Sequence, residues 1–143
     1  MRDDRGAFFG SVLATLNHIV VGDVIWLKRF AMHPGSVDVL LPVAEMSNPE
    51  RLDSILFEDF ADLRAERDKL DLLIKAWIAN LAESDLHDRL FYHDTKGDPY
   101  EKPYGSLINH LFLHQIHHRG QVSTLLSQFG VDFGDTDIIE IIA

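Results

Sequence analysis

Apolar residues recur along this chain at helical spacing in three long stretches, which predict three long helices. The first stretch covers residues 7–30 and is apolar nearly all round, with only Asn17 and Lys28 marking a wet side. A helix of that kind needs neighbours on more than one flank. Pro34 and Gly35 are expected to end it.

A heptad-like stripe predicts the second helix. Asn48 as N-cap and Pro49 as first helical residue predict its start, and Asp53 or Ser54 is an alternative start. Arg67 fills one polar position in the stripe. The apolar members of the stripe are Leu56, Phe60, Leu63, Leu70, Ile74, Trp77 and Leu81.

The connecting segments are less regular. Residues 37–47 are weakly patterned and predict at most a short helical turn over 43–46. Residues 86–103 carry aromatic residues around an Asp-Thr-Lys-Gly-Asp turn, which predicts a long crossover that forms either a small hairpin or an ordered loop.

The third helix is predicted to begin at 104–106 and to end near Phe129, with Gly130 as its C-cap. A last short helix is expected over residues 137–142. The pattern as a whole indicates an all-α chain that forms a single domain over residues 1–143.

Composition narrows the classes of function. The 46% hydrophobic and 25% charged fractions are those of an ordinary globular domain, and the net charge of −10 argues against binding to nucleic acid or to an anionic membrane surface. The chain has no cysteine, so it has no disulfide, thiolate ligand or cysteine nucleophile. The absence of a signal-peptide pattern at the start and the lack of cysteine suit a cytoplasmic protein.

The candidate chemistry lies in the histidines, of which there are eight. On a helical projection of the third helix, His118 falls at the centre of the apolar stripe and His114 within roughly 40° of it. His110 and His117 fall about 80° and 100° away, towards solvent. The pattern therefore selects His114 and His118, one turn apart, as the inward pair.

Two interpretations of this pair remain open at this stage. A buried imidazole is usually satisfied by the backbone nearby, but a shared cation would satisfy both rings at once. The best candidate for a third ligand is His18, which has Thr15 and Gly22 as small neighbours one turn to each side. Asp23 is the competing acidic ligand, but it lies about 140° round the helix from His18.

Three imidazoles without a thiolate suit zinc, nickel, iron(II) or copper better than magnesium or calcium. Three protein ligands also leave a coordination position open, as catalytic sites require. Two neighbouring residues have less specific roles. Gln121 could be a partner of a ligand histidine or a solvated side chain, and Gly120 suggests a close neighbour.

The chain resembles the DinB family, the broader group of DinB-like and YfiT-like metalloenzymes, over nearly its whole length. The resemblance rests on Phe8-Phe9-Gly10-Ser11 through Leu16-Asn17-His18, on Asp23, Trp26 and Arg29-Phe30, and on His110-Leu111-Phe112. It continues with His114-Gln115-Ile116-His117-His118-Arg119-Gly120-Gln121, then Gly130-Val131-Asp132 and Asp135-Thr136-Asp137.

This resemblance implies a four-helix bundle with a divalent metal, zinc, nickel or iron being favoured, held by His18, His114 and His118. Related branches include transferases that use mycothiol, bacillithiol or glutathione. The expected function is a metal-dependent thiol S-transferase acting on a small molecule. A metal-dependent hydrolase and a non-catalytic, metal-stabilised, stress-related dimer are the alternatives. The sequence assigns no catalytic residue beyond the metal ligands.

The chain departs from the family pattern at its start. Family members usually have another helix before the Phe8-Phe9-Gly10-Ser11 segment, and here only a few residues precede it. The missing helix would normally cover the first helix, so a large apolar face is expected to remain. Such a face usually marks an interface, and a homodimer is therefore expected.

Overall fold

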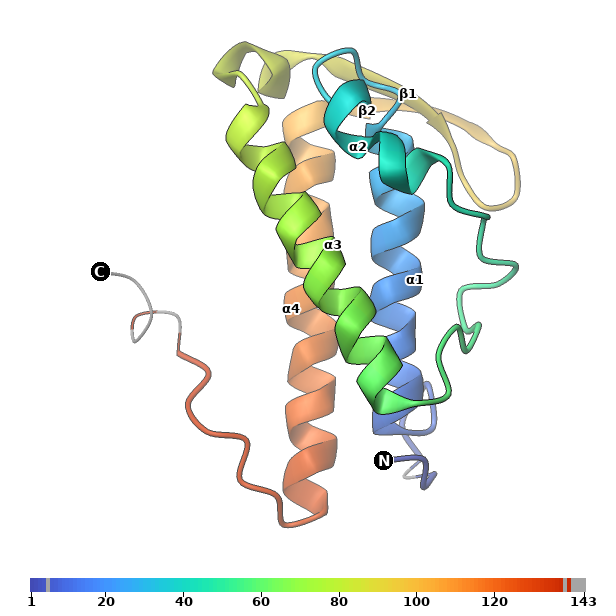
Figure 1. Cartoon of the computed structure of the whole chain (residues 1–143), viewed down its shortest axis with the longest axis vertical. Coiled ribbons are helices and arrows are strands. Elements are labelled where there is room, and N and C mark those ends of the chain that lie inside the picture. The colour runs from blue at the N-terminus through green and yellow to red at the C-terminus, as the bar shows by residue number, and fades with distance from the viewer. Residues whose placement is uncertain (5, 138, 140–143) are drawn as a thin grey trace.

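Three long helices dominate the fold (Figure 1). The computed structural model describes residues 1–4, 6–137 and 139. The long helices are α1 (Val12–Phe30), α3 (Phe60–Asn80) and α4 (Tyr104–Gln128). Along the chain α1 and α3 run in the same direction and α4 runs antiparallel to both (Figure 1). The shorter elements are α2 (Val37–Ala44), the 3-10 helix η1 (Glu83–His87), and the strands β1 (Arg89–His93) and β2 (Pro99–Pro103).

Local capping sets the ends of α1 and α4. The predicted start of the first helix at residue 7 was wrong, because Gly10 has a φ of 78° and Ser11 is an extended N-cap whose Oγ accepts the N–H of Ala14. The predicted end of α4 is confirmed. Gly130 has a φ of 69°, and the N–H groups of Gly130 and Val131 donate to Ser127 and Leu126, as in a Schellman motif.

The predicted start of the second long helix at residue 48, or at 53–54, was also wrong. α3 begins only at Phe60, where the Asp59 side chain accepts the N–H groups of Ala61 and Asp62. The residues before it are held by α1 instead. Asn17 Oδ1 accepts the N–H groups of Leu56 and Phe57, each at 2.9 Å, so this backbone is not free to join a helix.

The predictions for the two short helices had different outcomes. The turn expected at 43–46 is the eight-residue helix α2 (Val37–Ala44), which begins six residues earlier and buries Leu40 and Val43. The short helix expected over 137–142 lies mostly outside the described residues.

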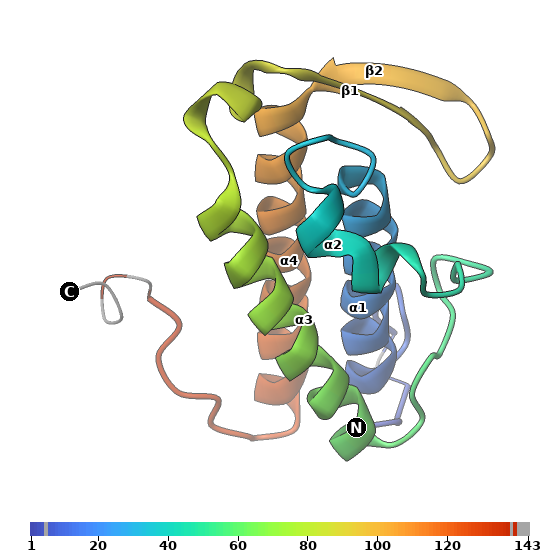
Figure 2. The same ribbon diagram turned by 45° about the horizontal axis from the view of Figure 1, so that its top comes forward.

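The predicted hairpin is confirmed, so the chain is mostly helical but not strictly all-α. Strands β1 and β2 pair antiparallel, with Tyr92 opposite Tyr100 and Leu90 opposite Lys102. The hairpin crosses the end of the bundle at which α1 ends (Figure 2). Among the described elements, the fourth helix is thus α2 rather than a C-terminal one.

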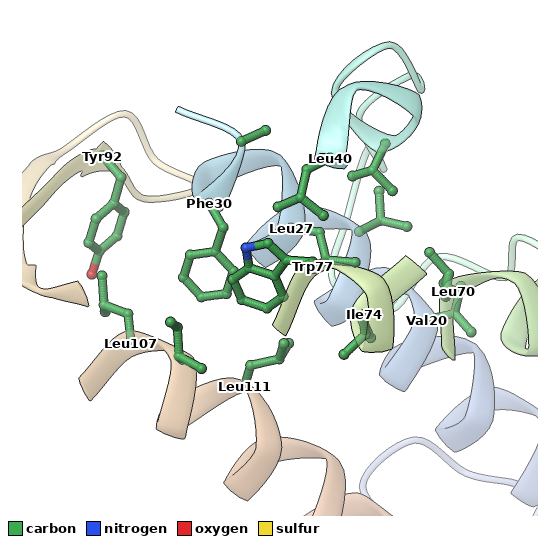
Figure 3. Packing of buried hydrophobic residues seen from close by; sticks show 14 of the residues in the cluster. Val20, Leu27, Phe30, Leu40, Leu70, Ile74, Trp77, Tyr92, Leu107 and Leu111 are labelled. Atoms are coloured by element: carbon green, nitrogen blue, oxygen red, sulfur yellow. The ribbon is translucent and has the colours of Figure 1, made fainter. Parts of the chain in front are cut away.

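The core fills the space between the long helices (Figure 3). The Phe30 ring stacks on Trp77 with 5.0 Å between ring centroids, and both side chains are fully buried. Leu27 from α1, Ile74 from α3 and Leu111 from α4 belong to the same cluster. This packing fixes α1 against α4 and so sets the positions of their histidines.

The chain itself covers much of α1. Segment 45–59 returns beside α1 (Figures 1 and 2), and the carbonyl of Phe57 accepts a hydrogen bond from Asn17. Asn17 is 0% exposed, so its predicted place on a wet side was wrong. Because the described chain buries most of α1, the apolar face that suggested a homodimer is not exposed. The dimer itself stays a prediction. No helix among the described residues combines the length and apolarity needed to cross a bilayer.

Candidate metal centre

The structure brings His18, His114 and His118 together. His18 lies on α1, and the other two lie one turn apart on the facing side of α4. The Nε2 atom of His18 is 3.2 Å from Nε2 of His114 and 3.2 Å from Nε2 of His118. His18 and His118 are buried, and His114 is half-buried. Three ring nitrogens from two distant stretches of sequence therefore face one point.

Hydrogen bonds on the far side of two rings determine which nitrogen carries the proton. The Nδ1–H of His18 donates to the carbonyl oxygen of Leu52 at 2.7 Å, because a carbonyl can only accept. The Nδ1–H of His118 donates to Oε1 of Gln121 at 2.8 Å. In the neutral rings both Nε2 atoms then carry lone pairs. Two such atoms cannot hydrogen-bond to each other at their 3.2 Å separation, and a bound cation would satisfy both.

The donor set fits a divalent metal. Zinc–nitrogen bonds of about 2.0–2.1 Å in tetrahedral geometry separate two ligand nitrogens by roughly 3.3 Å. The two 3.2 Å separations found here are close to that value. The carbonyl of Leu52 and the amide of Gln121 are also the kind of outer partner that orients metal-binding histidines.

Electrostatics favour the neutral, ligand-competent form of His114 and His118. Burial, followed by the neighbouring His118 and His18, lowers the pKa of His114 to about 4. Burial also lowers the pKa of His118, although the hydrogen bond to Gln121 opposes the shift. At neutral pH His114 is therefore unprotonated and can bind a metal without first losing a proton.

The sequence model of the DinB family matches residues 1–142, nearly the whole chain. The chain belongs to the DinB family. No curated protein and no solved structure matches it. Together, the family membership and the buried histidine cluster identify a site in this DinB-family chain that could hold a metal ion.

Several neighbours of the cluster in this DinB-family protein have roles that the sequence left open or missed. Gln121 is a partner of His118, the alternative that the sequence did not favour. His117 is exposed, as predicted. Phe9 was missed. Its ring stacks on His18 with centroids 4.0 Å apart and meets the edge of His118, which shields one side of the cluster.

A cleft of about 700 Å³ adjoins the cluster on the side of Phe9 and His118. Phe8, 89% exposed, lies at this cleft, and Arg51 and Asp53 contribute polar groups to its wall. The His18 and His118 rings line the cleft directly, so a small molecule in it could reach the point at which the ring nitrogens converge.

Asp23 does not join the cluster. It is fully buried on another side of α1, where it pairs with Arg67 of α3 and accepts the Nε2–H of Gln115 at 2.8 Å. Burial raises the pKa of Asp23, and Arg67 and Gln115 oppose the shift. The sequence-based argument that one ion would not take both His18 and Asp23 agrees with this placement.

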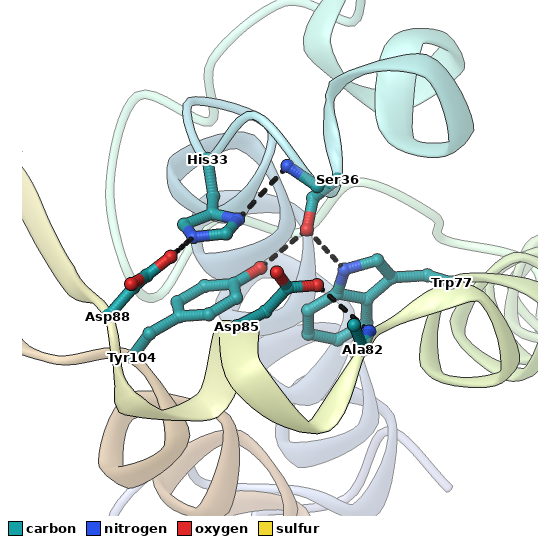
Figure 4. A network of polar contacts seen from close by, with 8 residues as sticks. His33, Ser36, Trp77, Ala82, Asp85, Asp88 and Tyr104 are labelled. Atoms are coloured by element: carbon teal, nitrogen blue, oxygen red, sulfur yellow. Dashed lines mark hydrogen bonds and ion pairs between the residues drawn. The ribbon is translucent and has the colours of Figure 1, made fainter.

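A second group of potential ligands, His33, Asp85 and Asp88, satisfies itself (Figure 4). The Nε2–H of His33 donates to Asp88 at 3.1 Å, while its Nδ1 accepts the N–H of Gly35 at 3.2 Å. Asp85 accepts the N–H of Ala82 at 2.9 Å. Because both nitrogens of the imidazole have protein partners, this group requires no cation.

Gly22 provides a first test of the geometry. A Cβ at this position would lie 2.8 Å from Cε1 of His114, whose Nδ1 is buried without a hydrogen-bond partner among the described residues. We expect Gly22→Ala to displace the ring and to weaken zinc binding by at least tenfold, comparable to losing an outer partner of a ligand. Competition with a chromophoric chelator measures the affinity.

Gly120 supplies the matched control for this prediction. The close neighbour expected at Gly120 is absent, since a Cβ there would meet nothing within 4 Å. Gly120→Ala should therefore leave zinc affinity unchanged and raise stability by about 0.5–1 kcal/mol, the usual gain for glycine to alanine within a helix. Zinc binding by Gly22→Ala with wild-type affinity would show that the close approach of α1 at Gly22 does not position the His114 ring for metal binding.

Proposed function

We propose that His18, His114 and His118 hold a divalent metal ion, zinc, nickel or iron(II), and that the protein is a metal-dependent thiol S-transferase. The observation that carries the metal site is the 3.2 Å separation of Nε2 atoms whose rings donate from the opposite nitrogen to Leu52 and Gln121. A bound cation would satisfy the lone pairs of both Nε2 atoms in neutral rings.

A bound divalent metal would supply Lewis acidity, which favours the thiolate form of a thiol ligand or activates a water. The chain contributes three ligands and leaves room for a fourth, from either the 700 Å³ cleft beside Phe9 or a 240 Å³ pocket lined by His18 and His114. Phe9 and Leu52 line that cleft and limit the access of water to the cluster.

Because the chain has no cysteine, a sulfur nucleophile must come from a small-molecule thiol of the mycothiol, bacillithiol or glutathione type. In the reaction, the thiol sulfur forms a bond to the electrophilic carbon and the leaving group departs with its electron pair. The thiol proton leaves with it, so that RSH and R′X give RSR′ and HX. The proposed role of the protein is to bind and orient the thiol in its more nucleophilic form.

A fluorogenic electrophile tests this proposal. In the presence of thiol, conversion of monobromobimane to its thioether should exceed the uncatalysed rate only when metal and protein are both present. His118→Ala should lose the activity, and His87→Ala, which changes an exposed histidine on η1, should keep it.

The outcome also separates the rival functions. Metal-dependent loss of an ester or amide without thiol would identify the hydrolase. A large metal-dependent rise in melting temperature without turnover would identify the non-catalytic, stress-related dimer.

The remaining assignments follow from composition and are proposals as well. We place the protein in the cytoplasm because a free-thiol cofactor and a cysteine-free chain suit a reducing compartment. The net charge of −10 argues against affinity for nucleic acid or for anionic membranes. A homodimer remains the expected assembly.

A further inference from the structure

Arg29 lies on the same side of α1 as His18. It follows His18 by eleven residues, which is three helical turns plus about 20°. Its guanidinium lies over the ring of Trp26, 4.6 Å from the centroid, and 5.1 Å from the centroid of the Tyr92 ring. The two rings hold the charged group in place without using its hydrogen bonds.

Within the described part of the chain, the Arg29 guanidinium forms no hydrogen bond and no ion pair. The nearby carboxylate of Asp94 is engaged by the N–H groups of Lys96 and Asp98, at 2.8 Å and 3.0 Å. Lys28 donates to the carbonyl of Met46. Burial lowers the pKa of Arg29, which is the direction expected for a cation that lacks a full counter-charge.

The Arg29 guanidinium and two histidines of the cluster line one cavity. A pocket of about 240 Å³ is lined by Arg29, Trp26, His18 and His114. It adjoins a second pocket of about 590 Å³, which also includes Arg29 and has Glu50 and Asp94 as its acidic groups. A small molecule in this space would meet an unpaired cation at one end and the imidazoles at the other.

We propose that Arg29 binds a carboxylate of the substrate thiol while the sulfur end reaches the histidine cluster. This inference rests on the proposed function. A carboxylate is the matching group because it accepts two parallel N–H bonds from a guanidinium. One arginine balances one negative charge, whereas a phosphate dianion would need another free cation, and Lys28 is already engaged.

Three probes with the same six-carbon chain test the proposal on the zinc-loaded full chain. They are 6-mercaptohexanoate, 6-mercapto-1-hexanol, which lacks the carboxylate, and hexanoate, which lacks the thiol. Calorimetry, with tryptophan fluorescence as a second readout, should show tighter binding of the mercaptohexanoate than of the mercaptohexanol. Arg29→Gln should weaken binding of both carboxylates about tenfold, the loss expected for a charged hydrogen bond, and leave the mercaptohexanol within twofold.

Two further variants complete the design. Arg64→Gln removes the same charge from an exposed position on α3, which lines a different pocket, and should change all three affinities by less than twofold. Arg29→Lys keeps the charge but loses the two parallel N–H donors of the guanidinium. Its affinity for carboxylates should therefore fall between those of wild type and Arg29→Gln. It also provides a result if Arg29→Gln does not fold.

The results distinguish this proposal from the proposed function. Equal binding of mercaptohexanoate and mercaptohexanol by the wild type, or unchanged carboxylate affinity in Arg29→Gln, would overturn the role of Arg29. If hexanoate binding depends on Arg29 but no thiol transfer occurs, the transferase proposal fails and the anion site stands. If thiol transfer occurs without any preference for a carboxylate, the reverse holds.

Discussion

Substituting alanine for His118 is expected to abolish stoichiometric metal binding. The variant removes one of three ring nitrogens and leaves the other two, 3.2 Å apart, with an open side. The loss of metal affinity should exceed the 10–100-fold decrease that follows removal of a residue that hydrogen-bonds to a ligand histidine. Elemental analysis of protein purified without a histidine tag measures the effect, and equal metal content in variant and wild type would eliminate the proposed centre.

Two neighbouring substitutions give this experiment a graded scale. Gln121→Ala removes only the acceptor that orients His118 and should cost 10–100-fold in affinity. His117→Ala removes an exposed imidazole that precedes His118. Its ring contacts the Gln121 amide at 3.3 Å and meets the His118 ring edge to face, but it is not one of the three converging ligands, so metal content should persist. A loss in His117→Ala equal to that in His118→Ala would point to surface binding by adjacent histidines instead.

The sequence predicted α4 and the direction of its histidines, because the spacing of residues along the chain determines both. His114 and His118 face the same way on any regular helix, and Gly130 ends that helix by a local backbone preference. The hairpin was equally accessible, since its turn residues and its aromatic strands are adjacent in the sequence.

The segment between α1 and α3 could not be predicted in the same way. Asn48-Pro49 has the composition of a helix start, but Asn17, some forty residues earlier, binds the backbone of Leu56 and Phe57. A contact of this range leaves no trace in local spacing. The same holds for Leu52, because its contribution to the site is a backbone carbonyl that any residue could supply.

The role of Phe9 was hidden for a related reason. The Phe8-Phe9-Gly10-Ser11 segment supported the family resemblance, yet nothing in its spacing shows that one ring stacks on His18 while the other is 89% exposed. Arg67 was visible as the polar position in an apolar stripe. The sequence presented its partner Asp23 only as a competing metal ligand, because the ion pair depends on the tertiary packing of α1 against α3.

Substitutions that break the ion pair between Asp23 and Arg67 should cause the largest loss of stability. Arg67→Met leaves a carboxylate that is 0% exposed without its counter-ion, and we expect a loss of about 3–5 kcal/mol in the free energy of unfolding at pH 7. Asp23→Leu should cost less, because the Arg67 side chain is 23% exposed and still has Asp71 as a partner. Urea denaturation of the metal-free variants measures both.

The double variant Asp23→Leu with Arg67→Met tests whether the single losses come from stranded charge. It should recover most of the stability lost in Arg67→Met, since an apolar pair of similar volume needs no solvation.

The pH dependence of stability gives an independent check. Burial raises the pKa of Asp23, and removal of Arg67 takes away the main opposing cause, so the folded variant takes up a proton at higher pH than the unfolded chain. The deficit of Arg67→Met should therefore shrink as the pH falls towards about 4, where the unfolded carboxyl begins to protonate as well. A deficit that is unchanged between pH 7 and pH 4.5 would show that lost packing of the arginine stem, and not the buried charge, destabilises the variant.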